Sequence, residues 1–423
     1  MMLRSSVIAL LLAGVAGAQR PSGGGTPNPM DSIRRLPNYR PAHDTVTLLS
    51  LQRLEKLPPA QQRDWFAYIG RSTAEYAHDT AVMHRELRQA HMREMVRAPY
   101  THDFSVKPYM TPAWFATDTA RRIADAIASY QAPNGGWSKH VDFTLHPRQP
   151  GESYYGESNE WQWISTFDND QTTEEIHFLN LASRAHADSR YERAIARGID
   201  YVLDTQYPNG CFPQVYPLEG SYHDAVTFND NVAVNVLTLL DSVAAGSYPA
   251  VTNHARQRAA AASARGLACI LDAQVRVNGE LTAWGQQHDP LTLAPTSARS
   301  YELTSLAGLE SSEILDYLMS LPTPSPRVVA AVYAGANWFK RVPVNGYTYE
   351  HYVLTPKAGA GPLWGRLYEI GTNRVIMANR DGKTLYDWNQ LTDRRSGYGW
   401  YSAAPAAMLA RFDAWSQTHP QAP

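Results

Sequence analysis

The sequence predicts a mainly α-helical protein, an α/α toroid in which helical hairpins form a barrel-like ring with long connecting loops and small β elements. Three observations favour this fold. Asn-Gly pairs recur at Asn134, Asn209, Asn278 and Asn345, at intervals of 75, 69 and 67 residues. The first three pairs follow a helical pattern that ends on a glutamine. Each interval has room for two helices of about 12–20 residues, so one unit is expected to be stacked several times.

Helical periodicity continues between these turns, where Asn-Gly suits a tight turn because both residues tolerate positive φ. The long polar loops that separate the helices are expected to be functional and to converge on one site. In the last loop, residues 365–370 and 373–377 have the pattern of a β-hairpin. An irregular α+β domain is the alternative fold. The expected helices span residues 113–131, 172–187, 189–206, 231–245, 252–274, 300–319, 326–340 and 404–416, and the loops span 132–171, 207–230, 275–299 and 341–402.

The N-terminal segment divides into three parts ahead of the main body at residues 101–423. Residues 1–18 combine a charged start, a short apolar stretch and a small-x-small cleavage site, which is typical of a secretory signal peptide. Residues 19–45 are predicted to be a flexible linker. Residues 46–100 are predicted to form an N-terminal helical hairpin, broken at Pro58-Pro59. We therefore expect a secreted or periplasmic protein.

Composition argues against several classes of protein. The net charge of −2 gives no support for nucleic-acid binding. The N-terminal apolar stretch is shorter than the roughly 20 residues that span a bilayer, and no other stretch is long enough, so no membrane span is expected. Cys211 and Cys269 are the only cysteines. Either one disulfide or two unpaired, buried thiols is consistent with the sequence.

The first loop carries the clearest candidate for a metal site. Asp168-Asn169-Asp170 offers several oxygen ligands, which suits a hard cation such as Ca²⁺, although the loop lacks the glycine and terminal glutamate of an EF-hand. The alternative is helix capping. Thr172-x-x-Glu175 has the pattern of a capping box, and carboxylates are favoured near a helix N-terminus.

The second and third loops carry further polar clusters. Asn229-Asp230-Asn231 stands directly before an expected helix, where N-capping is the simplest interpretation. The third loop places Asp289 and Arg299 among several amide side chains, which predicts a polar substrate cleft. An arginine at a helix start opposes the helix dipole. We therefore expect a carboxylate of the substrate or of the protein to hold Arg299.

Taken in order, six segments resemble the family 10 polysaccharide lyases, which are pectate lyases. The resemblance covers about residues 102–416, and the ordered series is specific although each motif is weak alone. The segments are residues 130–139 (YQAPNGGWSK), 166–175 (TFDNDQTTEE), 227–231 (TFNDN), 284–290 (WGQQHDP), 297–303 (SARSYEL) and 368–374 (YEIGTNR).

The resemblance implies an α/α toroid and calcium-dependent β-elimination on de-esterified homogalacturonan, the polygalacturonate of pectin, giving 4,5-unsaturated oligogalacturonides. By the same resemblance, Arg299 is the catalytic base, while Asp168 and Asp289 lie in the calcium and substrate site. The protein is expected to act as a monomer. The residues implied to line the cleft and bind substrate are Lys139, Asn229, Asp230, Arg374 and Arg380.

Four positions differ from the usual pattern of the family. Ser138 stands where proline is usual, Asp170 where glycine is common, and Asn231 where a second aspartate is common. Cys211 replaces a small or aromatic residue. These differences concern the substrate subsites more than the type of reaction.

An arginine base requires a lowered pKa, because a free guanidinium stays protonated above about pH 12. Ca²⁺, Lys139 and partial desolvation are expected to lower the pKa of Arg299. We therefore predict an alkaline activity optimum, and an optimum below about pH 6 would argue against this base.

Other functions fit parts of the same pattern. A glycoside hydrolase on a similar ring would use two carboxylates, such as Asp168 and Asp289, as acid and base without a metal. A lyase for another uronic-acid polysaccharide and a non-catalytic pectin-binding protein are further alternatives. Gln131-x-x-x-Gly135-x-Trp137 also matches a triterpene-cyclase motif, but the D-x-D-D motif of those enzymes is absent.

Overall fold

The structure is a computed structural model that describes residues 48–102, 104–156 and 165–421. The predicted signal peptide and nearly all of the segment before α2 lie outside these residues. The helices are α2 (Leu51–Leu54), α3 (Pro59–Gln89), α4 (Pro112–Phe115), α5 (Asp118–Ser129), α6 (Thr173–Ala185), α7 (Ser189–Thr205), α8 (Val232–Ala244), α9 (Asn253–Ala273), α10 (Gly308–Ser320), α11 (Pro326–Arg341) and α12 (Pro405–Ser416).

The strands form small antiparallel sheets on the loops between the helices. The expected hairpin near residue 370 is confirmed, because β12 pairs with β13. The pairs and sheets are β1 (Ser165–Thr166) with β2 (Val215–Tyr216); β3 (Val226–Thr227), β6 (Gln287–His288) and β7 (Pro295–Thr296); β4 (Arg276–Val277) with β5 (Glu280–Leu281); β9 (Tyr347–Glu350) with β10 (Val353–Pro356); β11 (Trp364–Gly365) with β15 (Tyr401–Ser402); and β8 (Leu306–Ala307), β12 (Leu367–Tyr368), β13 (Val375–Ala378) and β14 (Thr384–Leu385).

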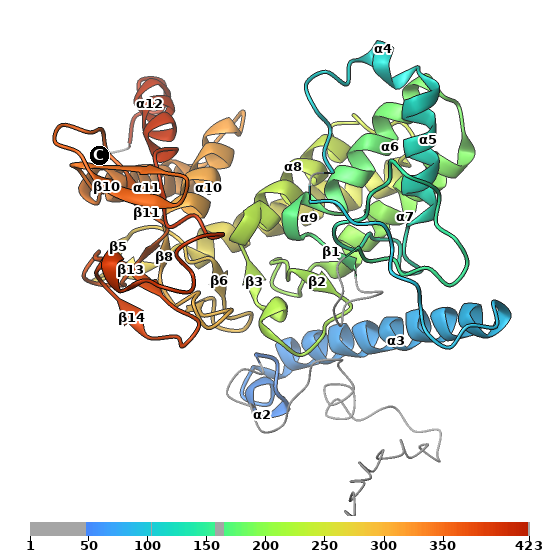
Figure 1. The fold of residues 1–423 in the computed structure, drawn as a ribbon. Coiled ribbons are helices and arrows are strands. Elements are labelled where there is room, and N and C mark those ends of the chain that lie inside the picture. Colours follow the sequence, from blue (N-terminus) through green and yellow to red (C-terminus); the bar gives the residue numbers. More distant parts are fainter. Residues whose placement is uncertain (1–47, 103, 157–164, 422–423) are drawn as a thin grey trace, which may run out of the picture.

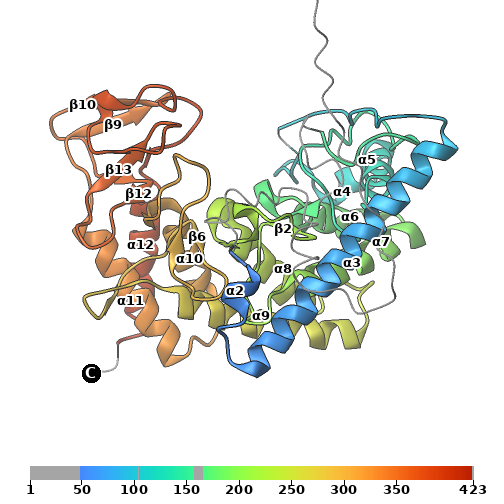
Figure 2. The ribbon, with the colours of Figure 1, turned by 90° about the horizontal axis from the view of Figure 1, so that it is seen from below.

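The predicted α/α toroid is wrong, because the helices in the described part of the chain form an open row and no closed barrel. The antiparallel pairs α6/α7, α8/α9 and α10/α11 pack side by side, with α8 between α6 and α10 and α9 between α7 and α11. Both ribbon views place α5 at one end of this row and α12 at the other (Figures 1 and 2).

The ends of the row explain why it does not close. At one end, α4 and α5 pack against α6. At the other end, α12 packs against α10 and α11. These additional helices cover the apolar faces of the outermost pairs, as terminal capping elements do in repeat proteins, so those faces need not meet each other.

The helix predictions are otherwise largely confirmed. The main exception is α10, which begins at Gly308 although the periodicity predicts a start at residue 300. Strand β8 occupies part of this difference, since Ala307 pairs with Leu367 of β12. A partner about 60 residues away in sequence therefore decides where this helix begins.

The repeat predicted from the Asn-Gly pairs is confirmed by its glutamines. The side-chain amide of each buried glutamine donates one hydrogen bond within its own turn and one to a carbonyl of the next helical pair. Each glutamine thus satisfies backbone groups of two neighbouring units, which explains why it recurs. The bonds run from Gln131 Nε2 to Gly135 O (2.7 Å) and Ala194 O of α7 (2.8 Å), from Gln206 Nε2 to Gly210 O (2.8 Å) and Ala262 O of α9 (2.8 Å), and from Gln274 Nε2 to Thr282 O and Ala331 O of α11 (both 3.0 Å).

The glycines of the repeat have positive φ, but their surroundings differ. Gly135 has a φ of 100°, and an added Cβ would lie 2.7 Å from the carbonyl oxygen of Arg197. Gly210 has a φ of 89°, and its Cβ would lie 2.5 Å from the carbonyl oxygen of Arg265. Gly279 has a φ of 86° at the tip of the β4–β5 hairpin, with nothing within 4 Å. The first two turns therefore press directly on the next helix, whereas the third does not.

Gly210→Ala is expected to lower the free energy of unfolding more than Gly279→Ala. Both variants carry the cost of a left-handed alanine, about 1–2 kcal/mol. Only Gly210→Ala also forces a methyl group against the backbone of Arg265, which adds about 1–3 kcal/mol. Thermal and denaturant unfolding of the two variants measure the difference, and equal losses would contradict this explanation of the repeat.

The N-terminal segment contains the one-turn helix α2 and the 31-residue helix α3 where a hairpin is predicted. The predicted break at Pro58-Pro59 is confirmed, since α3 begins at Pro59. Helix α3 crosses the helical row (Figure 2). The hydroxyl of Tyr68 donates to Thr205 O at the end of α7 (2.8 Å), and Trp65 packs on Tyr207 with ring centroids 4.9 Å apart. Helix α3 is therefore attached to the helical row by buried aromatic contacts.

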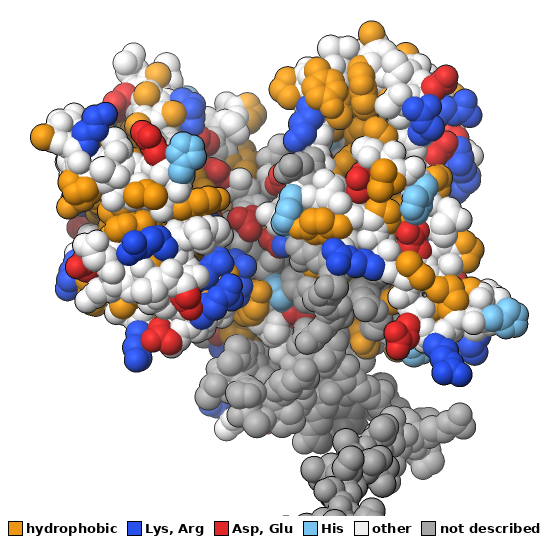
Figure 3. Space-filling view, viewed as in Figure 1, with side chains coloured by type: hydrophobic (Ala, Val, Ile, Leu, Met, Phe, Trp, Pro, Cys, Tyr) orange, Lys and Arg blue, Asp and Glu red, His pale blue; other side chains and the backbone are white. Residues whose placement is uncertain are grey.

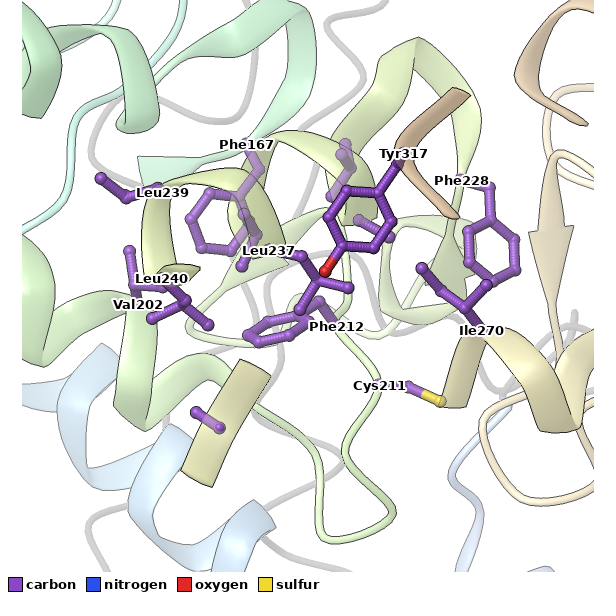
Figure 4. Close-up of a cluster of buried hydrophobic side chains, with 14 of the residues drawn as sticks. Phe167, Val202, Cys211, Phe212, Phe228, Leu237, Leu239, Leu240, Ile270 and Tyr317 are labelled. Carbon is purple, nitrogen blue, oxygen red and sulfur yellow. The ribbon is translucent and has the colours of Figure 1, made fainter. Parts of the chain in front are cut away.

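The sequence left the state of the two cysteines open, and the structure pairs them. Cys211 and Cys269 form a disulfide with a Cα–Cα distance of 5.4 Å. The bond joins the second Asn-Gly turn to α9. Figure 4 shows Cys211 in a buried cluster together with Phe167 and Phe228. No helix among the described residues combines the length and apolar character needed to cross a membrane.

Candidate active site

A charged cavity of about 620 Å³ is the main candidate site. Its lining residues lie between positions 102 and 399 and include residues from all four long loops. The space-filling view is hollowed between the half of the molecule that carries α5–α9 and the half that carries α10–α12 (Figure 3). Convergence of the loops, expected from the sequence, is therefore confirmed. Five of the predicted site residues line the cavity: Lys139, Asp168, Asn229, Asp230 and Arg299.

Two turns of related sequence supply the acidic floor of the cavity. One turn begins at Asp168 and the other at Asn229, and each follows a buried phenylalanine, Phe167 or Phe228. The second residue of each turn has a left-handed backbone conformation. The two turns contact each other. The phenylalanines anchor the turns in the core, so the polar residues beside them are presented to the cavity.

The side-chain caps expected from the helix-capping interpretation of the two turns are not formed by Thr172 or Asn231. Thr172 has a φ of 65° and makes no side-chain capping bond to α6. Its hydroxyl accepts a hydrogen bond from Trp137 N in the first loop (2.9 Å). Asn231 is also left-handed, with a φ of 62°, and makes no side-chain cap. Positive φ turns these side chains away from the first amides of the helices, and Thr172 holds the first loop instead.

Glu175, the other half of the expected capping box, is fully buried in α6. Burial, together with the charge of Glu174, raises the pKa of Glu175 from 4.5 to about 8. Between about pH 4.5 and 8, Glu175 is therefore protonated in the folded state but ionised in the unfolded state.

Glu175→Gln is expected to raise the free energy of unfolding in a pH-dependent way. Variant and parent should be similar near pH 4, where both states of the parent are protonated. The difference in the free energy of unfolding between variant and parent should grow as the pH rises from 4.5 to 8 and should approach about 4 kcal/mol. Urea unfolding at several pH values measures this difference. A difference that does not depend on pH would contradict the raised pKa.

Lys139 and Asp168 form an ion pair in the cavity. Both side chains are largely buried, at 15% and 6% exposure. Burial alone would raise the pKa of Asp168, but the charge and hydrogen bond of Lys139 outweigh it and hold the pKa below its usual value. Asp168 is therefore an anionic ligand group at neutral pH.

Asp230 lies against Asp168 and forms a hydrogen bond with it. Burial and the charge of Asp168 raise the pKa of Asp230 to about 7, against the opposing charge of Arg366. Two carboxylates in direct contact require a shared proton or a cation. The acidic floor of the cavity is therefore suited to binding positive charge.

Arg366 joins the two sides of the cavity and was not singled out in the sequence. Its Nη2 donates to Asn229 Oδ1 (3.1 Å) and Glu310 Oε1 (3.0 Å), and lies 3.7 Å from Asp230 Oδ1. Its guanidinium lies 4.3 Å from the ring centroid of Tyr398. Burial lowers its pKa, but the carboxylates around it raise the pKa above the ordinary arginine value. Arg366 therefore presents a fixed positive charge beside the acidic turns.

Arg299 is held by a protein carboxylate, one of the two partners expected from the sequence. Its Nε donates to Glu302 Oε2 (2.8 Å), and its Nη2 donates to Glu302 Oε1. Burial lowers the pKa of Arg299, but the hydrogen bonds and charge of Glu302 outweigh burial and raise it. The expected lowering of the Arg299 pKa is therefore not observed in this arrangement, because Glu302 stabilises the charged guanidinium.

Three predicted site residues do not line the cavity. Asp289 pairs with Arg53 of α2, with Oδ2 and Nη2 2.6 Å apart, and its Oδ1 accepts two backbone amide hydrogen bonds. Arg374 lies over the ring of Tyr386, with 3.7 Å to the centroid. Arg380 lies on the exposed surface, where its backbone amide donates to Asp393.

The sequence reasoning missed several residues that line the cavity. Glu302 lies three residues after Arg299 and within a quoted motif, so its ion pair could have been expected from the spacing. Arg366 and Arg394 lie in the last loop, where no spacing rule connects them to the acidic turns. The lining residues that were not predicted include Glu302, Arg366, Arg394 and Tyr398.

Comparisons with known proteins confirm the resemblance. The pectic acid lyase family model matches residues 131–409. A solved family 10 polysaccharide lyase from Cellvibrio cellulosa is 34% identical, with a TM-score of 0.64, over 74% of this chain and 98% of that chain. A mutant of the Cellvibrio cellulosa family 10 polysaccharide lyase, in complex with trigalacturonic acid, gives the same identity and TM-score over 71% of this chain and 96% of that chain.

No curated protein matches the chain. The family match nevertheless extends from the first Asn-Gly turn to α12 and includes the acidic turns and Arg299. With its fold, its charged cavity and these matches, the chain belongs to the pectic acid lyase family and is a family 10 pectate lyase.

Proposed function

We propose that this enzyme cleaves polygalacturonate by calcium-assisted β-elimination, with Arg299 as the base. The observation that carries the proposal is the charge pattern of the cavity, in which Asp168 and Asp230 are in contact and surrounded by Lys139, Arg299 and Arg366. A polymer that bears one carboxylate on each sugar needs such cationic side chains. The trigalacturonic acid bound to the Cellvibrio cellulosa relative supports this class of substrate.

The acidic turns fit a calcium ion by the chemistry of their donors. Ca²⁺ binds carboxylate and amide oxygens, and two carboxylates that share a hydrogen bond, one buried and one half-buried, would exchange a proton for a cation. We therefore infer that Asp168 and Asp230 are the main ligands, in place of the pair Asp168 and Asp289 expected from the sequence. Bound Ca²⁺ would neutralise the substrate carboxylate and stabilise the charge that develops beside it. Lys139, which pairs with Asp168, would then be free to contact the substrate.

The proposed reaction removes the C5 proton of a galacturonate and expels the glycosidic oxygen from C4. Neutral Arg299 accepts the proton, and the C5–H electron pair forms the C4–C5 double bond as the bond from C4 to oxygen breaks. The expelled glycosidic oxygen keeps the electrons of that bond, takes a proton from water and becomes the hydroxyl of the new reducing end. The products are a shortened chain and a 4,5-unsaturated sugar. Because Glu302 raises the pKa of Arg299, the neutral base requires separation from Glu302 or alkaline pH. This requirement supports the predicted alkaline optimum.

The other basic residues are assigned to substrate binding. Lys139 and Arg366 are placed to hold the carboxylates of neighbouring sugars, with Asn229 fixed between Arg366 and the acidic turn. Arg374 and Arg380 lie outside the cavity. They are proposed to contact more distant sugars of a long chain, whose polyanionic backbone can extend beyond the cavity.

The site of action is also a proposal. The features of residues 1–18 and the size of the substrate favour a secreted or periplasmic enzyme that meets the polymer outside the cytoplasm. We also propose that it acts as a monomer.

The proposal is tested with purified protein and polygalacturonate at pH 8–10. Formation of the unsaturated uronide is followed by ultraviolet absorbance, first with Ca²⁺, then with EGTA, and then with Ca²⁺ restored. We expect absorbance that EGTA stops and Ca²⁺ recovers. New reducing ends without any rise in ultraviolet absorbance would instead indicate a hydrolase, and activity unaffected by EGTA would reject calcium assistance.

A further inference from the structure

A second cluster of metal-binding side chains lies on α3, outside the residues that match the family. Glu75, His78 and Asp79 are spaced i, i+3 and i+4, so they share one face of the helix. One donor atom from each side chain lies within 4.8 Å of the other two. His78 Nδ1 is 3.7 Å from Glu75 Oε1 and 3.5 Å from Asp79 Oδ1. It is the one such group found among the described residues.

Asp79 provides a second, independent observation that points to a bound cation. Its side chain is fully buried, although Glu75 is 35% exposed and His78 is 58% exposed. Asp79 Oδ2 accepts a hydrogen bond from Asn134 Nδ2 (2.8 Å). Asp79 Oδ1 has no hydrogen-bond partner and lies on the side of His78. A buried carboxylate oxygen that accepts no hydrogen bond is costly unless a cation or donor reaches it.

The distances suit a small tetrahedral ion. Ligands at the usual bond lengths from Zn²⁺ lie about 3.3–3.6 Å apart at the corners of a tetrahedron. The two histidine–carboxylate distances are close to these values. One imidazole and two carboxylates form a three-residue zinc set that leaves the fourth position to water. Calcium fits less well, because it prefers more oxygen ligands and rarely imidazole.

We propose that Glu75, His78 and Asp79 bind one Zn²⁺-class ion that fastens α3 to the first Asn-Gly turn. The connection runs through Asn134, which holds Asp79 from the other side. Asn134 Oδ1 also accepts from Gly136 N (3.0 Å) and from Ser165 Oγ of β1 (2.8 Å).

The position of β1 gives this metal site a structural consequence. Strand β1 leads directly into the acidic turn at Asp168. Because Asn134 bonds to both Asp79 and Ser165, an ion that holds Asp79 in place also stabilises the strand that precedes the turn. The site does not depend on the proposed lyase mechanism, because none of its three ligands lines the cavity.

The test uses the full protein, stripped with EDTA and returned to excess Ca²⁺ so that the cavity ligands are occupied. Zn²⁺ is titrated calorimetrically into the parent, His78→Ala and His84→Ala. His84 is a second exposed histidine of α3 and serves as the matched control. We expect the parent and His84→Ala to bind the same equivalent of Zn²⁺, and His78→Ala to bind it at least tenfold more weakly. Equal binding by His78→Ala would overturn the proposal.

Hydrogen exchange then tests the fastening of α3. Zn²⁺ should slow exchange of the amides around residues 75–79 and 134–136 in the parent and in His84→Ala, but not in His78→Ala. Because His78 is exposed, its replacement should not prevent folding. Zn²⁺ binding without slower exchange at residues 134–136 would overturn the connection to the turn.

Discussion

Replacing Arg299 with alanine is expected to lower kcat on polygalacturonate by about 10²–10⁴-fold, the range contributed by a general base. Binding of trigalacturonate should change by less than about tenfold, because Lys139 and Arg366 still supply positive charge to the cavity. Absorbance kinetics and calorimetry on the same preparation give the two values. Activity retained in Arg299→Ala would place the base elsewhere.

A control is needed because Arg299→Ala leaves a buried carboxylate unpaired. The side chain of Glu302 is only 1% exposed, and Arg299 is its ion-pair partner. The double variant Arg299→Ala/Glu302→Gln removes that charge while keeping its shape. If loss of the base is the cause, the double variant stays inactive. Recovery of activity would mean that the single variant failed because of the unpaired charge.

Glu302→Gln alone provides a further readout through the pH profile. Glu302 raises the pKa of Arg299, so its neutralisation should lower that pKa. The alkaline rise of kcat should then move to lower pH in Glu302→Gln. A profile identical to that of the parent would indicate that Arg299 is not the group that titrates.

Replacing Asp230 with asparagine is expected to raise the calcium concentration needed for half-maximal activity by at least about a hundredfold, because a charged ligand is lost. Asp168→Asn should have an effect of similar size. Excess Ca²⁺ should restore part of the activity of each variant. Calcium titrations of the initial rate measure both effects, and an unchanged calcium requirement would remove these carboxylates from the metal site.

Asp289→Asn decides between the two proposed ligand sets. The sequence resemblance assigns Asp289 to the metal site, whereas the structure pairs this residue with Arg53. If the ligands are Asp168 and Asp230, Asp289→Asn should keep the calcium requirement of the parent. If Asp289→Asn instead raises the calcium requirement as strongly as Asp230→Asn does, Asp289 is one of the calcium ligands.

The predictions that succeeded depend mainly on local sequence. Helices α6, α7, α8, α9 and α11 lie within one or two residues of their predicted bounds, because the periodicity of apolar residues is read along a single segment. The recurring Asn-Gly pairs and glutamines also identified a repeated unit. The Asn-Gly pairs could not indicate whether the helical units close into a ring, because closure depends on whether the outermost helices meet.

The predictions that were wrong at the site also failed because contacts between distant parts of the chain override local preferences. Thr172 and Glu175 have the sequence of a capping box, but the first loop imposes a positive φ on Thr172 and burial removes Glu175 from solvent. Local chemistry alone favours the cap, and contacts with Trp137, 35 residues earlier, decide otherwise.

The sequence by itself determined the helical units, the order of the family motifs and five of the residues that line the cavity. Only the tertiary structure decided that the helices form an open row, that Asp230 lies against Asp168, and that Arg366 lies beside them. The physical reason is that helix formation and turn preference act over a few residues. The pKa of a buried carboxylate or guanidinium depends on charges that folding brings together from distant loops.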